Sequence, residues 1–102
     1  MRAAKVDLNH NFICQVFRKA GAKVCSLGGV GKGVPDLMVG LCGHNVLVEV
    51  KDPVKGQLNR IQVKWHGDWP GQVAVVRTEE DVAKLVIAVR QLSKKSGPDW
   101  AK

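Results

Sequence analysis

Three side chains in the middle of the chain have the types and spacing of a metal-dependent phosphoryl-transfer site. Asp36 follows Pro35, and Glu49 and Lys51 stand two residues apart in an apolar segment. Two carboxylates supply hard oxygen ligands that suit Mg²⁺ or Mn²⁺, especially where phosphate oxygens of a substrate complete the shell. A neighbouring ammonium can orient an attacking water or neutralise charge that develops on phosphorus. The alternative is an exposed Glu–Lys pair on an edge strand, and spacing alone leaves it open.

The segment that carries these residues has the pattern of a β-hairpin. Two apolar runs flank the turn-forming residues 42–45. If this four-residue loop closes symmetrically, Asp36 comes to lie opposite Lys51. Glu49 then lies on the same face, diagonal to Asp36 at roughly 7–8 Å between backbone positions. One divalent cation can bridge that gap.

The remaining elements follow from the spacing of apolar residues and from turn signals. Before the hairpin we expect a helix over residues 9–20, a strand over 23–27 and a glycine-rich loop over 28–33. After the hairpin we expect a helix over residues 57–66, a strand over 72–76 and a capped helix over 78–92. The order α-β-β-β-α-β with an additional C-terminal helix predicts one α/β domain with a mixed sheet over residues 1–93. Residues 94–102 lack periodicity, and we expect them to form a loose basic tail.

The composition of the 102 residues excludes several classes of protein. A hydrophobic fraction of 45% and a charged fraction of 25% are typical of a globular domain and unlike a disordered chain. No apolar run approaches the roughly 18–20 residues of a membrane span, and no signal-peptide core follows the first residues, so we expect a cytoplasmic protein. Three cysteines without close spacing favour reduced, buried thiols over a disulfide framework or a zinc site.

The charge is unevenly distributed. The total is +7, with a basic first third, a slightly acidic middle over residues 35–80 and a basic end. A basic envelope favours a polyanionic partner, although a solvated surface gives the same total. The glycine-rich loop lacks the Walker spacing of a nucleotide-binding loop, so we expect it to contact a nucleic-acid backbone instead. The candidate contacts are Lys32, Lys55 and Arg60.

The joint spacing of Pro35-Asp36, twelve residues and Glu49-Val50-Lys51 resembles the motif of the PD-(D/E)XK nuclease superfamily. The closer likeness is to the virus-type replication-repair nuclease (VRR-NUC) domain, in its small stand-alone phage form. It covers about residues 7–89, and the segments that carry it are Gly31-Lys-Gly-Val-Pro-Asp-Leu-Met-Val-Gly40, Leu47-Val-Glu-Val-Lys-Asp52, Gln62-Val-Lys-Trp65 and Gly71-Gln-Val-Ala-Val-Val76. The expected fold is therefore a restriction-endonuclease-like core.

This resemblance implies a metal-dependent DNA endonuclease that hydrolyses phosphodiester bonds. Asp36 and Glu49 would ligate Mg²⁺ or Mn²⁺ with the Val50 carbonyl, and Lys51 would position the nucleophilic water. Gln62 would point at the site from the second helix, or would be an ordinary exposed polar residue. The family suggests branched DNA as substrate, as for a Holliday-junction resolvase, and symmetric cutting of a junction requires two sites and hence a homodimer.

The first helix departs from the family pattern. Many relatives carry an acidic residue there, and the equivalent position in this chain is Phe12, which predicts one metal rather than two. Asp7, Asn9 or Asn11 could substitute through water, or could serve as helix caps. The departure keeps open an alternative function, a non-catalytic nucleic-acid-binding module that retains the nuclease fold. Trp65 is expected in the core.

Overall fold

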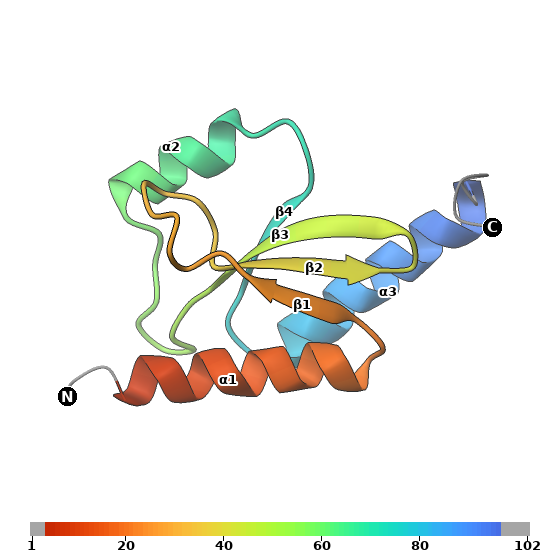
Figure 1. Cartoon of the computed structure of the whole chain (residues 1–102), viewed down its shortest axis with the longest axis horizontal. Helices are drawn as coiled ribbons and strands as arrows, with labels where there is room; N and C mark the ends of the chain where they lie inside the picture. The colour runs from red at the N-terminus through yellow and green to blue at the C-terminus, as the bar shows by residue number, and fades with distance from the viewer. Residues whose placement is uncertain (1–3, 97–102) are drawn as a thin grey trace.

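The computed structural model describes the backbone of residues 4–96 and the side chains of residues 8–93. In chain order the elements are α1 (Ala4–Lys19), β1 (Lys23–Ser26), β2 (Leu37–Leu41), β3 (His44–Val50), α2 (Arg60–Asp68), β4 (Val73–Val76) and α3 (Glu79–Ser96) (Figure 1). The predicted α/β class and element order are confirmed. The last helix continues to Ser96, beyond the predicted end near Leu92, and residues 97–102 lie outside the described residues.

The four strands form one mixed sheet in the order β1-β2-β3-β4. The first three strands pair antiparallel, and β4 pairs parallel with β3. A parallel pair requires a crossover connection, and α2 lies in it. The predicted mixed sheet is therefore confirmed, and β3, which carries Glu49, is one of its two central strands.

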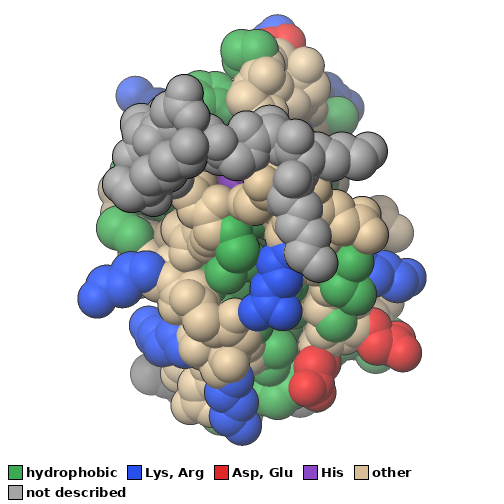
Figure 2. All heavy atoms as spheres, turned by 90° about the vertical axis from the view of Figure 1, so that its right-hand side faces the viewer, with side chains coloured by type: hydrophobic (Ala, Val, Ile, Leu, Met, Phe, Trp, Pro, Cys, Tyr) green, Lys and Arg blue, Asp and Glu red, His purple; other side chains and the backbone are tan. Residues whose placement is uncertain are grey.

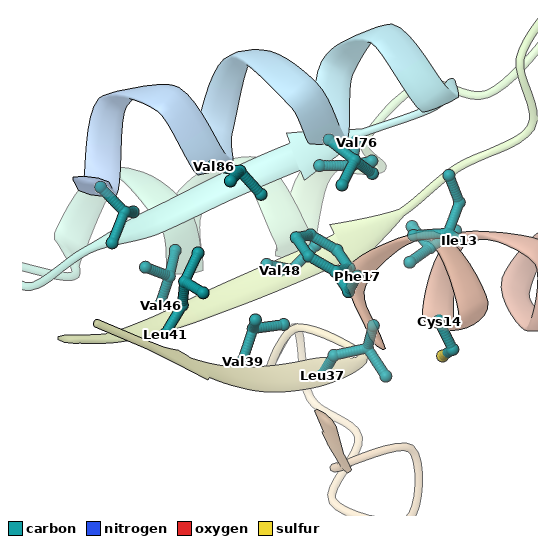
Figure 3. Close-up of a cluster of buried hydrophobic side chains, with 13 residues drawn as sticks. Ile13, Cys14, Phe17, Leu37, Val39, Leu41, Val46, Val48, Val76 and Val86 are labelled. Carbon is teal, nitrogen blue, oxygen red and sulfur yellow. The ribbon is translucent and has the colours of Figure 1, made fainter. Parts of the chain in front are cut away.

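The hydrophobic core lies between the sheet and the helices α1 and α3, while α2 lies on the other side of the sheet (Figures 1 and 3). Ile13 and Phe17 of α1 are fully buried against valines of β2, β3 and α3. Side chains alternate along a strand, so Val48 points into this core and Glu49 points to the α2 side. One face of β3 thus packs in the hydrophobic core, and the opposite face carries the Glu49 carboxylate.

The hairpin is tighter than the sequence predicts. A two-residue turn, Cys42-Gly43, pairs Leu41 with His44 instead of closing a four-residue loop. Both turn residues have positive φ, 53° and 82°, which is the type I′ geometry that matches the twist of the strands. The predicted register was therefore wrong: continuing the observed pairing places Asp36 opposite Glu49 instead of Lys51. The two carboxylates are consequently closer neighbours than expected.

Two other predictions about individual residues were wrong. Cys14 is buried, but Cys25 and Cys42 are exposed, since they lie on edge strand β1 and in the hairpin turn. Trp65 is half-buried and lies outside the core, because α2 contributes no fully buried residue. The three cysteines are free.

The part of the chain that the structure describes has no helix long and apolar enough to cross a membrane. The face that carries the β2–β3 turn and the end of α3 shows Lys and Arg side chains scattered over the surface (Figure 2). Among the side chains coloured by type in this view, hydrophobic and other residues lie between the Lys and Arg side chains.

Candidate active site

The start of α2 aims Gln62 at Glu49. The Asn59 side chain accepts a hydrogen bond from the Gln62 backbone N–H (2.9 Å), and Gln62 Oε1 accepts one from the Asn59 backbone N–H (3.0 Å). This capping box satisfies helix N–H groups and fixes the amide orientation of Gln62. Gln62 Nε2 is left to donate to Glu49 Oε2 at 3.2 Å. Of the two interpretations of Gln62, the structure favours the one that points it at the site.

Asp36 and Glu49 form a closely coupled carboxylate pair. Asp36 Oδ2 accepts a hydrogen bond from the Val50 backbone N–H at 2.9 Å, which ties the loop after Pro35 to the end of β3. Glu49 is only 3% exposed. Burial, followed by the hydrogen bonding and charge of Asp36, raises the pKa of Glu49 to about 8, while the Lys51 ammonium acts in the opposite direction. Without a bound cation, the surroundings of the pair therefore do not stabilise a second negative charge, and Glu49 keeps its proton at neutral pH.

Lys51 is held beside this pair by contacts to its backbone. Its N–H donates to the Val76 carbonyl (3.0 Å), and its carbonyl accepts from Asn9 Nδ2 (2.8 Å). The ammonium Nζ lies 3.8 Å from Glu49 Oε2. Because α1 begins well before Asn9, this residue is not a helix cap, and its amide Nδ2 donates to the backbone carbonyls of Lys51 and Arg77.

His66 is a site residue that sequence reasoning missed. It follows Gln62 by one helical turn, and its Nε2 lies 4.0 Å from Glu49 Oε1. Burial, followed by the charge of Lys51, lowers the pKa of His66, so the imidazole is neutral at pH 7. Neither of the two facing atoms has a hydrogen-bond partner among the described residues. The i, i+4 spacing from Gln62 was the signal that could have found it.

Gly56 is a second residue that the sequence did not single out. A Cβ built at this position would lie 2.5 Å from the Asp52 backbone N and 2.6 Å from Lys51 Cβ. The loop after β3 thus folds back directly onto Lys51, with the Gly56 N–H donating to the Asp52 carbonyl (3.1 Å). The Gly56 carbonyl accepts a hydrogen bond from Arg77 Nε at 2.9 Å. Any side chain at this position would displace the loop.

Asp36, Glu49, Lys51, Gly56 and Gln62 line a cavity of about 460 Å³, which we call the carboxylate pocket; His66 is not part of its lining. Its lining is His10, Asp36, Glu49, Val50, Lys51, Asp52, Lys55, Gly56, Gln57 and Gln62. The pocket brings together all four predicted catalytic residues, the predicted backbone ligand and Lys55. Lys32 and Arg60 line a different cavity.

The residue of α1 that lines the pocket is His10, and Phe12, the position taken as equivalent to the acidic residue of the family, does not line it. Phe12 is 46% exposed and does not line the pocket. Asn11 is also exposed, and the side chain of Asp7 lies outside the described residues. The first helix therefore presents an imidazole where an acidic residue was sought.

The donor set of the pocket fits a hard divalent cation. Within residues 8–93, no group of three or more His, Cys, Asp or Glu side chains is arranged to hold a metal ion, but the two predicted carboxylate ligands, Asp36 and Glu49, both line the pocket. Glu49 Oε1 is buried without a hydrogen-bond partner. A buried carboxylate oxygen of this kind requires a cation or a proton. The raised pKa of Glu49 also indicates that the ionised carboxylate requires a positive partner in this pocket.

Comparison with known proteins gives one informative match. No protein-family model and no curated protein matches the chain. The chain is similar to a solved structure described as "VRR_NUC domain", with 28% sequence identity and a TM-score of 0.68 over 81% of this chain and 95% of that chain. Fold and motifs together define a nuclease-type domain. In particular, the likeness to a VRR-NUC domain structure agrees with the resemblance that the motifs of the chain show.

Proposed function

We propose that this protein is a Mg²⁺- or Mn²⁺-dependent endonuclease that hydrolyses phosphodiester bonds in DNA. The observation that carries the proposal is the meeting of Asp36, Glu49 and Lys51 in one pocket of a fold similar to a VRR-NUC domain. The carboxylates and the ammonium match the demands of phosphodiester hydrolysis, which needs a cation site and a positive group near the attacked phosphorus.

Each residue of the pocket has a distinct part in the proposed reaction. Asp36 and Glu49 would hold the cation with the Val50 carbonyl; when bound, the cation polarises the phosphate and lowers the pKa of water. Lys51 would orient the attacking water and offset the charge that develops on the phosphate oxygens. Gln62 holds one oxygen of Glu49 by its 3.2 Å hydrogen bond and so fixes the carboxylate.

The proposed substrate is branched or structured DNA, cut by a homodimer. The net charge of +7 favours a polyanionic partner, and the Lys55 ammonium adds a positive charge to the lining of the carboxylate pocket. A domain of 102 residues covers little of a junction, and cutting two strands symmetrically requires two sites. Action on such DNA would take place in the cytoplasm.

Cleavage assays on branched and linear DNA test the catalytic proposal. We expect cutting with Mg²⁺ or Mn²⁺ and none in EDTA. Glu49→Gln and Lys51→Ala should each reduce the rate at least about 100-fold. Glu80→Gln and Lys84→Ala, on the exposed face of α3, are the matched controls and should retain the rate.

Two results would contradict this function. Cleavage that persists in EDTA, or in both site variants, excludes the proposed chemistry. Salt-sensitive DNA binding without cleavage under any metal condition favours the alternative of a non-catalytic binding module. For the dimer, light scattering that shows only monomer at high concentration counts against the junction-resolving version.

A further inference from the structure

A second cavity lies on α2, between this helix and the glycine-rich loop. It measures about 400 Å³, and we call it the α2 groove; its lining is Lys32, Arg60, Ile61, Lys64, Trp65 and Asp68. The groove belongs to no part of the proposed catalytic machinery. Its volume is within the range of small-ligand sites.

The wall of the α2 groove is apolar and aromatic. Ile61 is 63% exposed, so its aliphatic side chain is available to a ligand in the groove. Trp65 stacks on Trp69 with ring centroids 4.9 Å apart and planes 15° apart. Trp69, which directly follows α2, is itself 42% exposed, so the stacked pair leaves indole surface open to solvent at the end of this helix. Aromatic surface of this kind stacks with nucleobases of any sequence.

The rim of the α2 groove is positively charged. Lys64 is paired with Asp68 at 2.9 Å, whereas Lys32 and Arg60 have no acidic partner among the side chains of residues 8–93. Lys32 is held there by its loop, because Gly33 packs so closely on α2 that an added Cβ would lie 3.0 Å from Ile61 Cγ2. Two unpaired cations at an apolar cavity match a ligand that is both planar and anionic, as a nucleotide is.

The α2 groove and the carboxylate pocket lie on adjoining faces of the same helix. Gln62 and His66 face Glu49, while the residues just before them, Ile61 and Trp65, line the groove. A helix is about 10–12 Å across with its side chains. A single strand a few nucleotides long can therefore occupy both sites.

We propose that the α2 groove binds an unpaired nucleotide of the nucleic-acid strand that enters the carboxylate pocket. The base would lie against Ile61 and Trp65, with its phosphate between Lys32 and Arg60. A base-paired duplex keeps its bases stacked on one another, so the groove selects DNA with an unpaired segment beside the cutting site. This inference rests on the proposed function for the identity of the strand.

Binding of the full chain in EDTA separates the groove from the chemistry. The probes are a labelled blunt DNA duplex and the same duplex with a four-nucleotide single-stranded overhang, compared by fluorescence anisotropy. We expect tighter binding of the overhang probe by about fivefold or more, as one stacked base would give. Ile61→Asp and Arg60→Glu should abolish this preference, and both change exposed side chains. Ile87→Asp and Lys84→Glu on α3 are the matched controls and should keep it.

Several outcomes would overturn the groove proposal. Equal affinity for the two probes, or an unchanged preference in Ile61→Asp that is folded by circular dichroism, excludes it while leaving cleavage by the carboxylate pocket intact. Binding to neither probe removes both proposals together. If Ile61→Asp turns a dimer into a monomer and leaves the preference unchanged, the groove is an interface between two copies of the chain.

Discussion

Glu49 Oε1 and His66 Nε2 face each other at 4.0 Å, both buried and both without a hydrogen-bond partner among the described residues. One comes from the central strand β3 and the other from α2. A buried carboxylate opposite a neutral imidazole is a poor place for a negative charge. The folded protein without metal therefore disfavours ionisation of Glu49, and this has consequences for stability.

The stability of the metal-free protein should fall as pH rises. The pKa of Glu49 is raised from 4.5 to about 8, so the folded state binds this proton more tightly than the unfolded state does. The resulting stabilisation is complete below pH 4.5 and is lost as pH rises through about 8. Thermal melting in EDTA between pH 4.5 and 9 should show a decline that is absent in Glu49→Gln.

The comparison with Glu49→Gln also removes a competing effect. The lowered pKa of His66 contributes stability above pH 6.5 that is lost as pH falls, which is the opposite sign. Because both proteins retain His66, the difference between their profiles isolates Glu49. Glu80→Gln, an exposed glutamate of α3, should keep the wild-type slope. Parallel profiles for wild type and Glu49→Gln would show that Glu49 ionises normally.

Divalent cations should restore the stability that the metal-free protein loses as pH rises. A cation bound by Asp36 and Glu49 offsets the charge that the pocket cannot neutralise, and a ligand that binds only the folded state stabilises it by about 2.7 kcal/mol at 100 times its Kd. At pH 8 we expect Mn²⁺ or Mg²⁺ to raise the melting temperature of the wild type. Asp36→Asn should lose this response. An equal rise in the wild type and in Asp36→Asn would place the cation elsewhere.

The site residues that spacing alone located lie close together along the chain, whereas Gln62 came from the family resemblance. Asp36, Glu49 and Lys51 lie on one hairpin, so alternation along strands was enough to bring them together even though the register was wrong. The register failed because Cys42 adopts a positive φ, which residue type does not reveal. The two-residue turn that results sets Asp36 against Glu49.

The residues that were missed depend on contacts between distant elements. His66 reaches the site because α2 lies over the sheet with Gln62 and His66 directed toward Glu49. Trp65 was expected in the core from its apolar character, yet α2 meets the sheet through Gln62 and His66, which leaves the indole half-buried. The orientation of a short helix on a sheet is a tertiary property, and periodicity alone does not fix it.

Gln62 and Asn59 should separate stability from catalysis. Both belong to the capping box, and replacing either by alanine should cost about 1 kcal/mol of stability. Gln62 also holds Glu49, and removing a residue that fixes a metal ligand costs about 10–100-fold in metal affinity or activity. We therefore expect similar melting temperatures for Asn59→Ala and Gln62→Ala, with a large loss of cleavage in Gln62→Ala alone. Equal cleavage rates would make Gln62 a helix cap and nothing more.

Adding one methyl group at Gly56, as in Gly56→Ala, should reduce the DNA cleavage activity. A Cβ there would lie 2.5 Å from the Asp52 backbone and 2.6 Å from Lys51 Cβ, and backbone atoms cannot move aside as a flexible side chain does. Gly56→Ala should therefore shift the loop that holds Lys51 and lower the cleavage rate, with a smaller change in metal binding to Asp36 and Glu49. Gly67→Ala is the matched control: nothing lies within 4 Å of its added Cβ, and replacing a helical glycine by alanine should stabilise the protein by about 0.5–1 kcal/mol. Cleavage rates and Mn²⁺ affinities for both variants test this, and a fully active Gly56→Ala would show that the position of the loop does not control Lys51.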